Sequence, residues 1–214
     1  MKAISLDAAG TLFDLAEPVG EVYARFALQE GLQLDPQKTE KRFRRAFQKL
    51  PSPDYALTQE GHTSERAWWH ELVLQATEIP AGQAFERFFK QLFDYYERPE
   101  AWHLFDDTLP FLTEAGSRYP LVVVSNFDAR LHPILEGLGL SPFLKTVISS
   151  SDACSRKPDS KIFRIALKNL ALPPSEVLHI GDSLTADYQG AQKSGMQAFH
   201  LQREKGQTLF SAFT

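Results

Sequence analysis

The stretch Ala3-Ile4-Ser5-Leu6-Asp7-Ala8-Ala9-Gly10-Thr11-Leu12 decides the fold of this chain. Its first four residues form a short apolar run that is typical of a buried strand. Asp7 follows at the carboxyl end of that strand, and Gly10-Thr11 predicts a turn of the backbone. Reactive groups of open α/β sheets gather at this edge. A carboxylate there suits a nucleophile or a metal ligand, although an Asp that caps a turn has the same local pattern.

Strands alternate with helices in the second half of the chain. Apolar runs predict strands over 121–125, 146–149, 177–181 and 197–200, and helical periodicity predicts helices over about 107–117, 129–138, 159–170 and 184–194. Such alternation is typical of right-handed crossovers and a parallel sheet. We therefore expect an α/β fold in which the strand before Asp7 joins this sheet.

The residues between these two parts show helical periodicity and little strand-like alternation. Four helical segments are expected, over about 19–27, 36–50, 63–73 and 81–96. Four helices in series with no strand between them predict a helical bundle inserted into another fold. The expected division is an α/β core of residues 1–14 and 101–214, with residues 15–100 as the insert.

Composition narrows the class of protein. The chain has 214 residues, 43% of them hydrophobic, which suffices for a packed core. Its formal net charge of −4 argues against nucleic acid as an obligate partner. A single cysteine, Cys154, excludes an internal disulfide. Because Lys2 leads straight into a strand and no apolar run reaches the roughly 20 residues of a membrane span, we expect a cytoplasmic protein with no membrane partner.

Three later strand ends carry polar groups. Ser125-Asn126 follows one strand, Lys157-Pro158 precedes a helix, and Gly181-Asp182-Ser183 follows another strand, with Asp187 one helical turn later. Taken singly, these residues also fit helix caps or a solvated lysine. Together they provide a cation, hydroxyl and amide groups for an anion, and carboxylates for Mg²⁺.

The order of these motifs resembles the haloacid dehalogenase superfamily. The matching segments, in chain order, are Asp7-x-Ala9-Gly10-Thr11-Leu12, Ser125, Lys157-Pro158, and Gly181-Asp182-Ser183 with Asp187. Two further stretches, Trp68-Trp69 and Ser125-Asn126-Phe127-Asp128-x-Arg130-Leu131, look like signatures of the REG-2-like subgroup. The resemblance covers the whole chain and implies a Rossmannoid core with a helical cap.

The resemblance also implies roles for individual residues. Asp7 would be the nucleophile and a Mg²⁺ ligand, joined by the main-chain carbonyl of Ala9 and the carboxylate of Asp182. Asp187 would support the metal through water. Ser125 and Lys157 would hold the transferring phosphoryl group, and the further substrate contacts would be Thr11 and Asn126. These roles imply a Mg²⁺-dependent phosphatase of small phosphate esters that works through an aspartyl phosphate.

Ala9 departs from the phosphatase pattern of the superfamily. Phosphatases carry a second Asp at this position, which protonates the leaving alcohol and then activates water, whereas a methyl group does neither. Three alternatives follow. A non-catalytic phosphate-binding or regulatory protein would tolerate the loss, and haloacid dehalogenases lack this Asp but need no metal. Phosphonatases have Ala here and use a cap lysine, for which the chain offers Lys38, Lys41 and Lys49. The sequence does not identify the substrate or choose between monomer and homodimer.

Overall fold

The computed structural model describes residues 1–55 and 61–213. Within these ranges, one parallel sheet has the strand order β5-β4-β1-β6-β7. Its strands are β1 (Ala3–Leu6), β4 (Leu121–Ser125), β5 (Leu144–Ser149), β6 (Val177–Gly181) and β7 (Gln197–His200). All residues of β1 are buried, as its central position requires. The predicted parallel sheet is confirmed, and β1 joins it between strands that lie far away in sequence.

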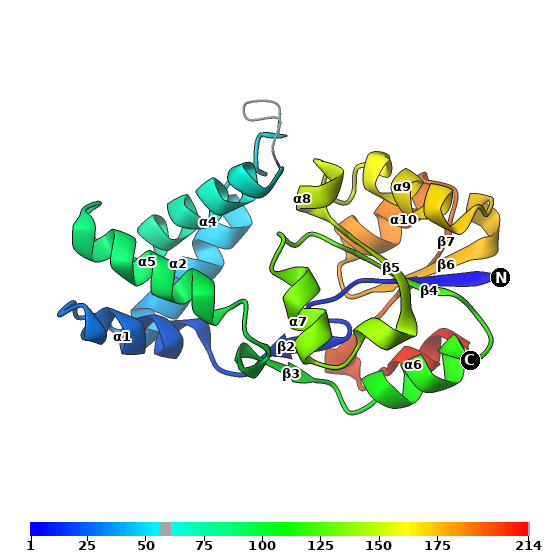
Figure 1. Cartoon of the computed structure of the whole chain (residues 1–214), viewed down its shortest axis with the longest axis horizontal. Coiled ribbons are helices and arrows are strands. Elements are labelled where there is room, and N and C mark those ends of the chain that lie inside the picture. Colours follow the sequence, from blue (N-terminus) through cyan, green and yellow to red (C-terminus); the bar gives the residue numbers. More distant parts are fainter. Residues whose placement is uncertain (56–60, 214) are drawn as a thin grey trace.

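Helices cover both faces of this sheet (Figure 1). On one face α6 (Thr108–Gly116) and α7 (Leu131–Gly137) pack against side chains such as Ile4. On the other face α9 (Ser160–Leu170) packs with α10 (Gly190–Lys193) against side chains such as Ala3. Because successive side chains of a strand point to opposite faces, neighbouring residues of β1 belong to two separate hydrophobic clusters. The predicted α/β layering is therefore confirmed.

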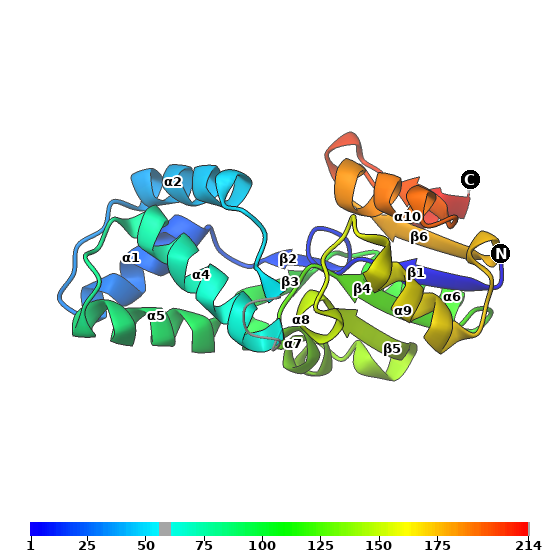
Figure 2. The same ribbon diagram turned by 90° about the horizontal axis from the view of Figure 1, so that it is seen from above.

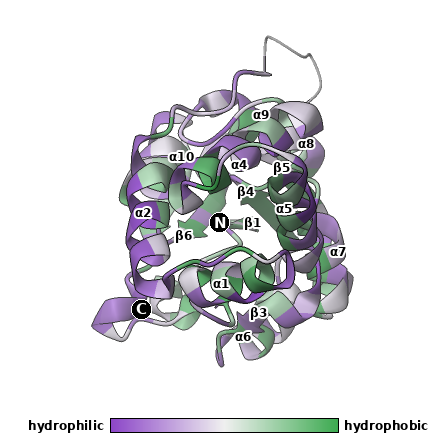
Figure 3. Cartoon of the chain, turned by 90° about the vertical axis from the view of Figure 1, so that its left-hand side faces the viewer, coloured by the Kyte–Doolittle hydropathy of each residue, from purple (hydrophilic) through white to green (hydrophobic). Residues whose placement is uncertain are grey.

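The remaining long helices form a lobe beside the sheet, and the view from above separates the two parts (Figure 2). They are α1 (Val19–Gln29), α2 (Pro36–Lys49), α4 (Gly61–Thr77) and α5 (Gln83–Tyr95). A hydrophobic cluster of their own, with Tyr23, Phe85 and Phe88 at its centre, holds them together. Figure 3 shows that α2 is mostly hydrophilic and α5 largely hydrophobic. None of the described helices combines the length and apolarity needed to cross a membrane.

A two-stranded antiparallel ribbon joins the two parts. Strand β2 (Phe13–Leu15) pairs with β3 (Trp102–Leu104), so the chain enters and leaves the helical lobe at neighbouring points. Sequence periodicity does not predict this ribbon, because three residues are too few to establish an alternating pattern.

The segment after β6 differs from the uniform helix expected over 184–194. It begins as a π-helix (Leu184–Gln189) and continues as α10. Ser183 caps the π-helix, because its hydroxyl accepts a hydrogen bond from the backbone N–H of Ala186 at 3.1 Å. Short π-helical turns occur frequently at functional sites, and this one carries Asp187.

Candidate functional site

Asp7 lies where β1 ends, and Lys157 reaches it from a segment 150 residues later in the chain. Lys157 Nζ donates to Asp7 Oδ1 at 2.6 Å, to Asp187 Oδ1 at 2.5 Å and to the carbonyl of Val124 at 2.8 Å. All three donors of the buried ammonium group are therefore used. Burial by itself lowers the pKa of Lys157, but the negative charges of Asp187 and Asp7 outweigh it and raise that pKa above its usual value.

Asn126 fixes the backbone of Lys157. Its Nδ2 donates to the Lys157 carbonyl at 3.0 Å, and its Oδ1 accepts from the Lys157 N–H at 2.7 Å. Asn126 was predicted to contact substrate. Both the oxygen and the nitrogen of its side-chain amide form hydrogen bonds with the main chain of Lys157. Its observed contacts position the lysine.

Two glycines let the fourth motif approach Asp7. A Cβ at Gly181 would lie 2.3 Å from the Asp187 carboxyl carbon, so only glycine leaves room for that side chain. Gly10 has φ of 82°, in the left-handed region, and a Cβ there would lie 2.7 Å from Asp182 Oδ2. These close approaches bring Asp182 and Asp187 to the end of β1.

Three carboxylates meet at this edge of the sheet. Asp7, Asp182 and Asp187 each offer an oxygen, and these oxygens all lie within 4.8 Å of one another. Loss of hydration and the charges of Asp7 and Asp187 raise the pKa of Asp182 to about 7. Burial acts in the same direction on Asp187, but Lys157 and His179 hold its pKa well below the usual range.

This donor set fits a divalent cation. Lys157 forms ion pairs with Asp7 and Asp187 but not with Asp182, so the three carboxylates outnumber the ammonium group of Lys157 and negative charge remains in excess beside Asp182. Clustered carboxylate oxygens are the ligands that Mg²⁺ prefers. Asp7 and Asp182 have room for such a role, whereas both oxygens of Asp187 already accept hydrogen bonds, from Lys157, His179 and the N–H of Ser183.

His179 belongs to this network, although no motif points to it. It is fully buried in β6, where its Nε2 lies 3.1 Å from Asp187 Oδ1 and its Nδ1 lies 2.8 Å from Ser5 Oγ. A carboxylate only accepts hydrogen bonds, so Nε2 donates to Asp187. The available signal in the sequence was a polar side chain on each of two neighbouring apolar strands, Ser5 and His179, which the register of β1 and β6 pairs.

Ser125 and Thr11 are both buried but lie in different surroundings. Ser125 ends β4 directly after Val124, whose carbonyl anchors Lys157. It therefore lies beside the lysine with which it was predicted to act. Thr11 is fully buried, and its hydroxyl has no hydrogen-bond partner in the part of the chain that the structure describes. It does not line the cavity next to the site.

A cavity of about 230 Å³ lies between the helical lobe and the sheet, with Ala9 in its wall. The helical lobe and the core both contribute aromatic rings to it, and the polar side chains of the wall include two guanidinium groups. The lining residues are Ala9, Asp14, Leu15, Val19, Tyr23, Phe43, Phe47, Trp69, Val73, Phe89, Leu92, Phe93, Tyr96, Trp102, Asn126, Phe127, Arg130 and Arg156. The cavity thus opens beside the residue that departs from the phosphatase pattern.

The lysines considered for a phosphonatase mechanism lie elsewhere. Lys38, Lys41 and Lys49 are exposed on α2, and none of them lines the cavity. A lysine that forms a Schiff base with the substrate must reach the reacting atoms. Their positions therefore do not support that alternative.

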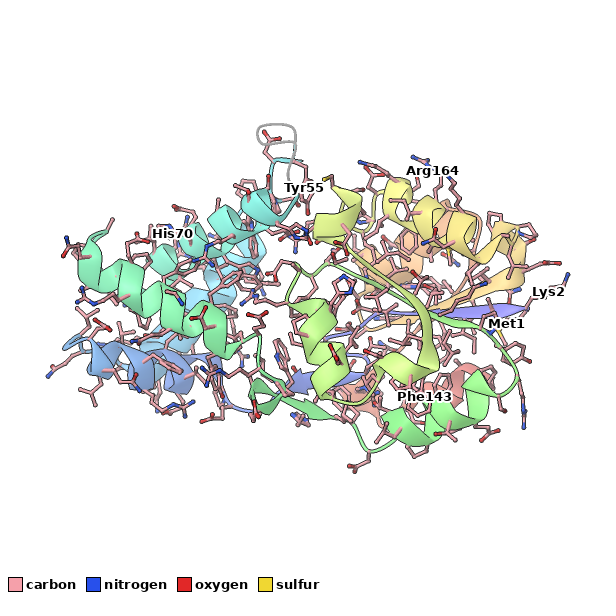
Figure 4. All side chains as sticks on the ribbon, viewed as in Figure 1. Met1, Lys2, Tyr55, His70, Phe143 and Arg164 are labelled. Atoms are coloured by element: carbon pink, nitrogen blue, oxygen red, sulfur yellow. The ribbon has the colours of Figure 1, made fainter. Side chains whose placement is uncertain are left out.

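Glu65 is a second buried residue that sequence reasoning missed. It lies on α4, where its carboxylate accepts hydrogen bonds from the hydroxyls of Tyr55 and Ser150. Ser150 begins α8 (Ser150–Ala153) in the core, and Tyr55 lies near the point where α4 approaches α8 (Figure 4). The buried carboxylate of Glu65, with one hydroxyl partner from each part of the molecule, therefore joins the helical lobe to the core.

Comparison with known proteins gives a consistent result. A family model described as haloacid dehalogenase-like hydrolase matches residues 1–195. The haloacid dehalogenase-like hydrolase domain-containing protein 3 of Mus musculus is 37% identical over 205 residues, which cover 93% of this chain and 81% of that protein. The rhythmically expressed gene 2 protein of Drosophila melanogaster is 26% identical over 209 residues, covering 91% and 80%.

Solved structures share the fold. A HAD phosphatase from Thermococcus onnurineus superposes with a TM-score of 0.67 at 23% identity, covering 98% of this chain and 90% of that one. An L-2-haloacid dehalogenase from Xanthobacter autotrophicus gives a TM-score of 0.70 at 20% identity, covering 94% and 77%. Enzymes of two different chemistries thus superpose equally well, and only the residues of the site can separate them.

Proposed function

Because the chain belongs to the haloacid dehalogenase-like hydrolase family, and specifically resembles its REG-2-like subgroup, we propose that it hydrolyses small phosphate esters through Asp7. The observation that carries the proposal is the meeting of Asp7, Lys157 and Asp182 at one edge of the sheet. A carboxylate nucleophile, a cation for the phosphoryl oxygens and a further carboxylate for a metal are the parts that phosphoryl transfer requires.

In the first step an oxygen of Asp7 attacks phosphorus. The bond between phosphorus and the ester oxygen breaks, and its electron pair leaves with that oxygen. Lys157 contributes its positive charge beside Asp7 and Ser125 its hydroxyl to the oxygens of the transferring group, while Asn126 and Asp187 keep the lysine in place. In the second step water attacks the phosphorus, which releases phosphate and restores the Asp7 carboxylate.

The residues that would hold Mg²⁺ are Asp7, Asp182 and the main-chain carbonyl of Ala9, with Asp187 in support. The excess of negative charge beside Asp182 supports this assignment. A bound cation neutralises charge on the phosphoryl oxygens and orients them. The same excess argues against a haloacid dehalogenase, whose chemistry needs no metal.

Ala9 sets the limit of this activity. Its methyl group neither protonates a leaving alkoxide nor removes a proton from the attacking water. A general acid–base group raises the rate by about 10² to 10⁴, so esters of ordinary alcohols should be hydrolysed more slowly by that factor. Esters with a weakly basic leaving group do not need that group to be protonated. Their hydrolysis is still slowed in the second step, because Ala9 removes no proton from the attacking water.

The test measures hydrolysis of phenyl phosphate in the presence of Mg²⁺ and again after a chelator has removed the metal. We expect activity to need the metal and to fall to background in Asp7→Asn. The matched control is Asp94→Asn, which removes a carboxylate that pairs with Lys90 on the surface of α5, away from the site. Metal-independent activity, or activity that survives Asp7→Asn, would falsify the proposal.

A second candidate function, favoured by Ala9, is a phosphate-binding protein without turnover. The two candidates differ in the fate of the phosphoryl group. Binding of phosphate without product over a long incubation supports the second candidate. A phosphorylated Asp7 that accumulates, seen by mass spectrometry, shows instead that the first step works and the second is slow.

We also propose that residues 15–100 act as a cap domain over the site. The separate hydrophobic cluster of this lobe and its attachment through the β2–β3 ribbon support the division. The cavity between the two parts gives the cap a direct role in choosing the substrate.

A further inference from the structure

We propose that the preferred substrate is a phosphate monoester of an aromatic alcohol, whose ring occupies the cavity between the cap and the core. The inference rests on the proposed phosphatase function and deepens it by naming the leaving group. Two independent observations support it: the chemistry of the cavity wall and the absence of a proton donor at Ala9.

The wall presents aromatic surface on both sides of the cavity. Trp69 and Phe93 come from the cap, and Trp102 and Phe127 come from the core, with the last two rings 5.5 Å apart. Phe47 extends this surface and contacts Trp69 at 6.3 Å between ring centroids. Aromatic side chains favour flat apolar groups in stacked or edge-on contact. A flexible polyhydroxyl group would leave its hydroxyls with few partners here.

The size of the cavity matches one or two rings. It encloses about 230 Å³. A cavity of about 150 Å³ holds a benzene molecule, so this one takes a substituted ring or a fused pair. Since Ala9 and Asn126 belong to the wall, a ring placed here lies beside the residues that surround Asp7.

The charges in the wall suit an aryloxide. Arg130 is held by both oxygens of Asp128, at 2.8 and 2.6 Å, and lies 3.8 Å from the centroid of Phe93. Arg156 lies 5.0 Å from the centroid of Trp68 and has no carboxylate partner among residues 1–55 and 61–213. Its positive charge favours a leaving group that departs as an anion.

Ala9 selects the same leaving group on chemical grounds. When the bond from phosphorus to the ring oxygen breaks, the electron pair stays on that oxygen and delocalises into the ring. The phenolate leaves without a proton and takes one from water after release. An alkoxide needs protonation as it leaves, and no carboxylate stands at position 9 to supply it.

Four substrates distinguish the effect of an aromatic ring on kcat/KM from the effect of the basicity of the leaving group. 2-Naphthyl phosphate and phenyl phosphate have aromatic, weakly basic leaving groups, acetyl phosphate has a weakly basic group without a ring, and cyclohexyl phosphate has a ring but a basic alkoxide. We expect kcat/KM to be highest for 2-naphthyl phosphate and lowest for cyclohexyl phosphate. We also expect 2-naphthol to inhibit the hydrolysis of acetyl phosphate competitively. Equal kcat/KM for 2-naphthyl and cyclohexyl phosphates overturns the inference, as does a failure of 2-naphthol to inhibit.

A pair of variants assigns the effect to the cavity. Phe47 and Phe213 are both 47% exposed, but only Phe47 lines this cavity. Phe47→Ala should raise KM for 2-naphthyl phosphate about two- to tenfold more than it raises KM for acetyl phosphate, while Phe213→Ala changes neither. Equal effects of Phe47→Ala on both substrates contradict a ring in the cavity. If acetyl phosphate itself shows no Asp7-dependent hydrolysis, the proposed phosphatase function fails, and this inference with it.

Discussion

At the scale of single residues, one methyl group separates this site from the phosphatase pattern. Asp7, Lys157 and Asp182 meet at the carboxyl edge of the sheet, and Ala9 stands where the phosphatase pattern has an acid. Ala9 lines the cavity, so a larger side chain at this position has space beside the reacting atoms. The missing carboxylate is therefore the departure that limits the phosphatase activity proposed above.

Restoring the carboxylate should restore the chemistry. In Ala9→Asp we expect kcat for cyclohexyl phosphate to rise, by about 10² to 10⁴ at most, because the new acid protonates the leaving alkoxide. Ala9→Asn, which has nearly the same shape and no acid, is the control and should show no gain. The measurement is steady-state release of phosphate with Mg²⁺. A folded Ala9→Asp protein without any gain means that Ala9 is not what limits turnover.

At the scale of elements, α4 and α8 hold the helical lobe against the core. The contact consists of the buried carboxylate of Glu65 and the hydroxyls of Tyr55 and Ser150. The Ser150 hydroxyl also lies 3.0 Å from the carbonyl oxygen of Phe127, a residue of the cavity wall. Packing of the two elements therefore influences both stability and the shape of the cavity.

We expect Glu65→Ala to lower the free energy of unfolding by about 1–3 kcal/mol, because two hydroxyls lose a buried charged acceptor. The control is Glu71→Ala on the same helix, an exposed residue whose carboxylate accepts a hydrogen bond from Gln75, with an expected change within about 0.5 kcal/mol. Urea unfolding followed by tryptophan fluorescence measures both. Equal losses in the two variants would show that the Glu65 contact does not tie the cap to the core.

At the scale of the whole molecule, we expect the clustered carboxylates of the site to make the stability of the fold depend on pH. Three carboxylates and one ammonium group share the carboxyl edge of the sheet, which leaves Asp182 with a pKa near 7 against an ordinary value of 3.8. Between these values the folded protein keeps the proton of Asp182 and the unfolded chain releases it. Stability from this group therefore falls as the pH rises from about 4 to about 7.

Asp182→Asn removes this penalty. Without divalent cations, the variant should gain in melting temperature over wild type as the pH rises through that range. At pH 7.5, Mg²⁺ at about 100 times its Kd should stabilise wild type by about 2.7 kcal/mol, which raises its Tm by about 5–10 °C, and should stabilise the variant much less. Thermal unfolding with and without Mg²⁺ measures both effects. An equal response of the two proteins to Mg²⁺ would show that Asp182 is not a ligand of the metal.

The sequence by itself determined the parallel sheet, the order of its motifs and the carboxylates at its edge. Each of these features is set by a few consecutive residues. An apolar run predicts a strand, and the residue that follows a parallel strand lies at the carboxyl edge of the sheet. The adjacency of β1 and β6 brought Asp7 and Asp182 together as expected. The family resemblance rested on the same local motifs and was confirmed.

Only the tertiary structure decided which groups touch. The pairing of Lys157 with Asp7 and Asp187, the burial of His179 against Ser5, and the Glu65 contact between the helical lobe and the core join residues that lie far apart in sequence. The cavity likewise takes its wall from both parts of the molecule. Hydrogen bonds and cavity walls depend on distances of a few ångströms, and packing of the whole chain sets those distances.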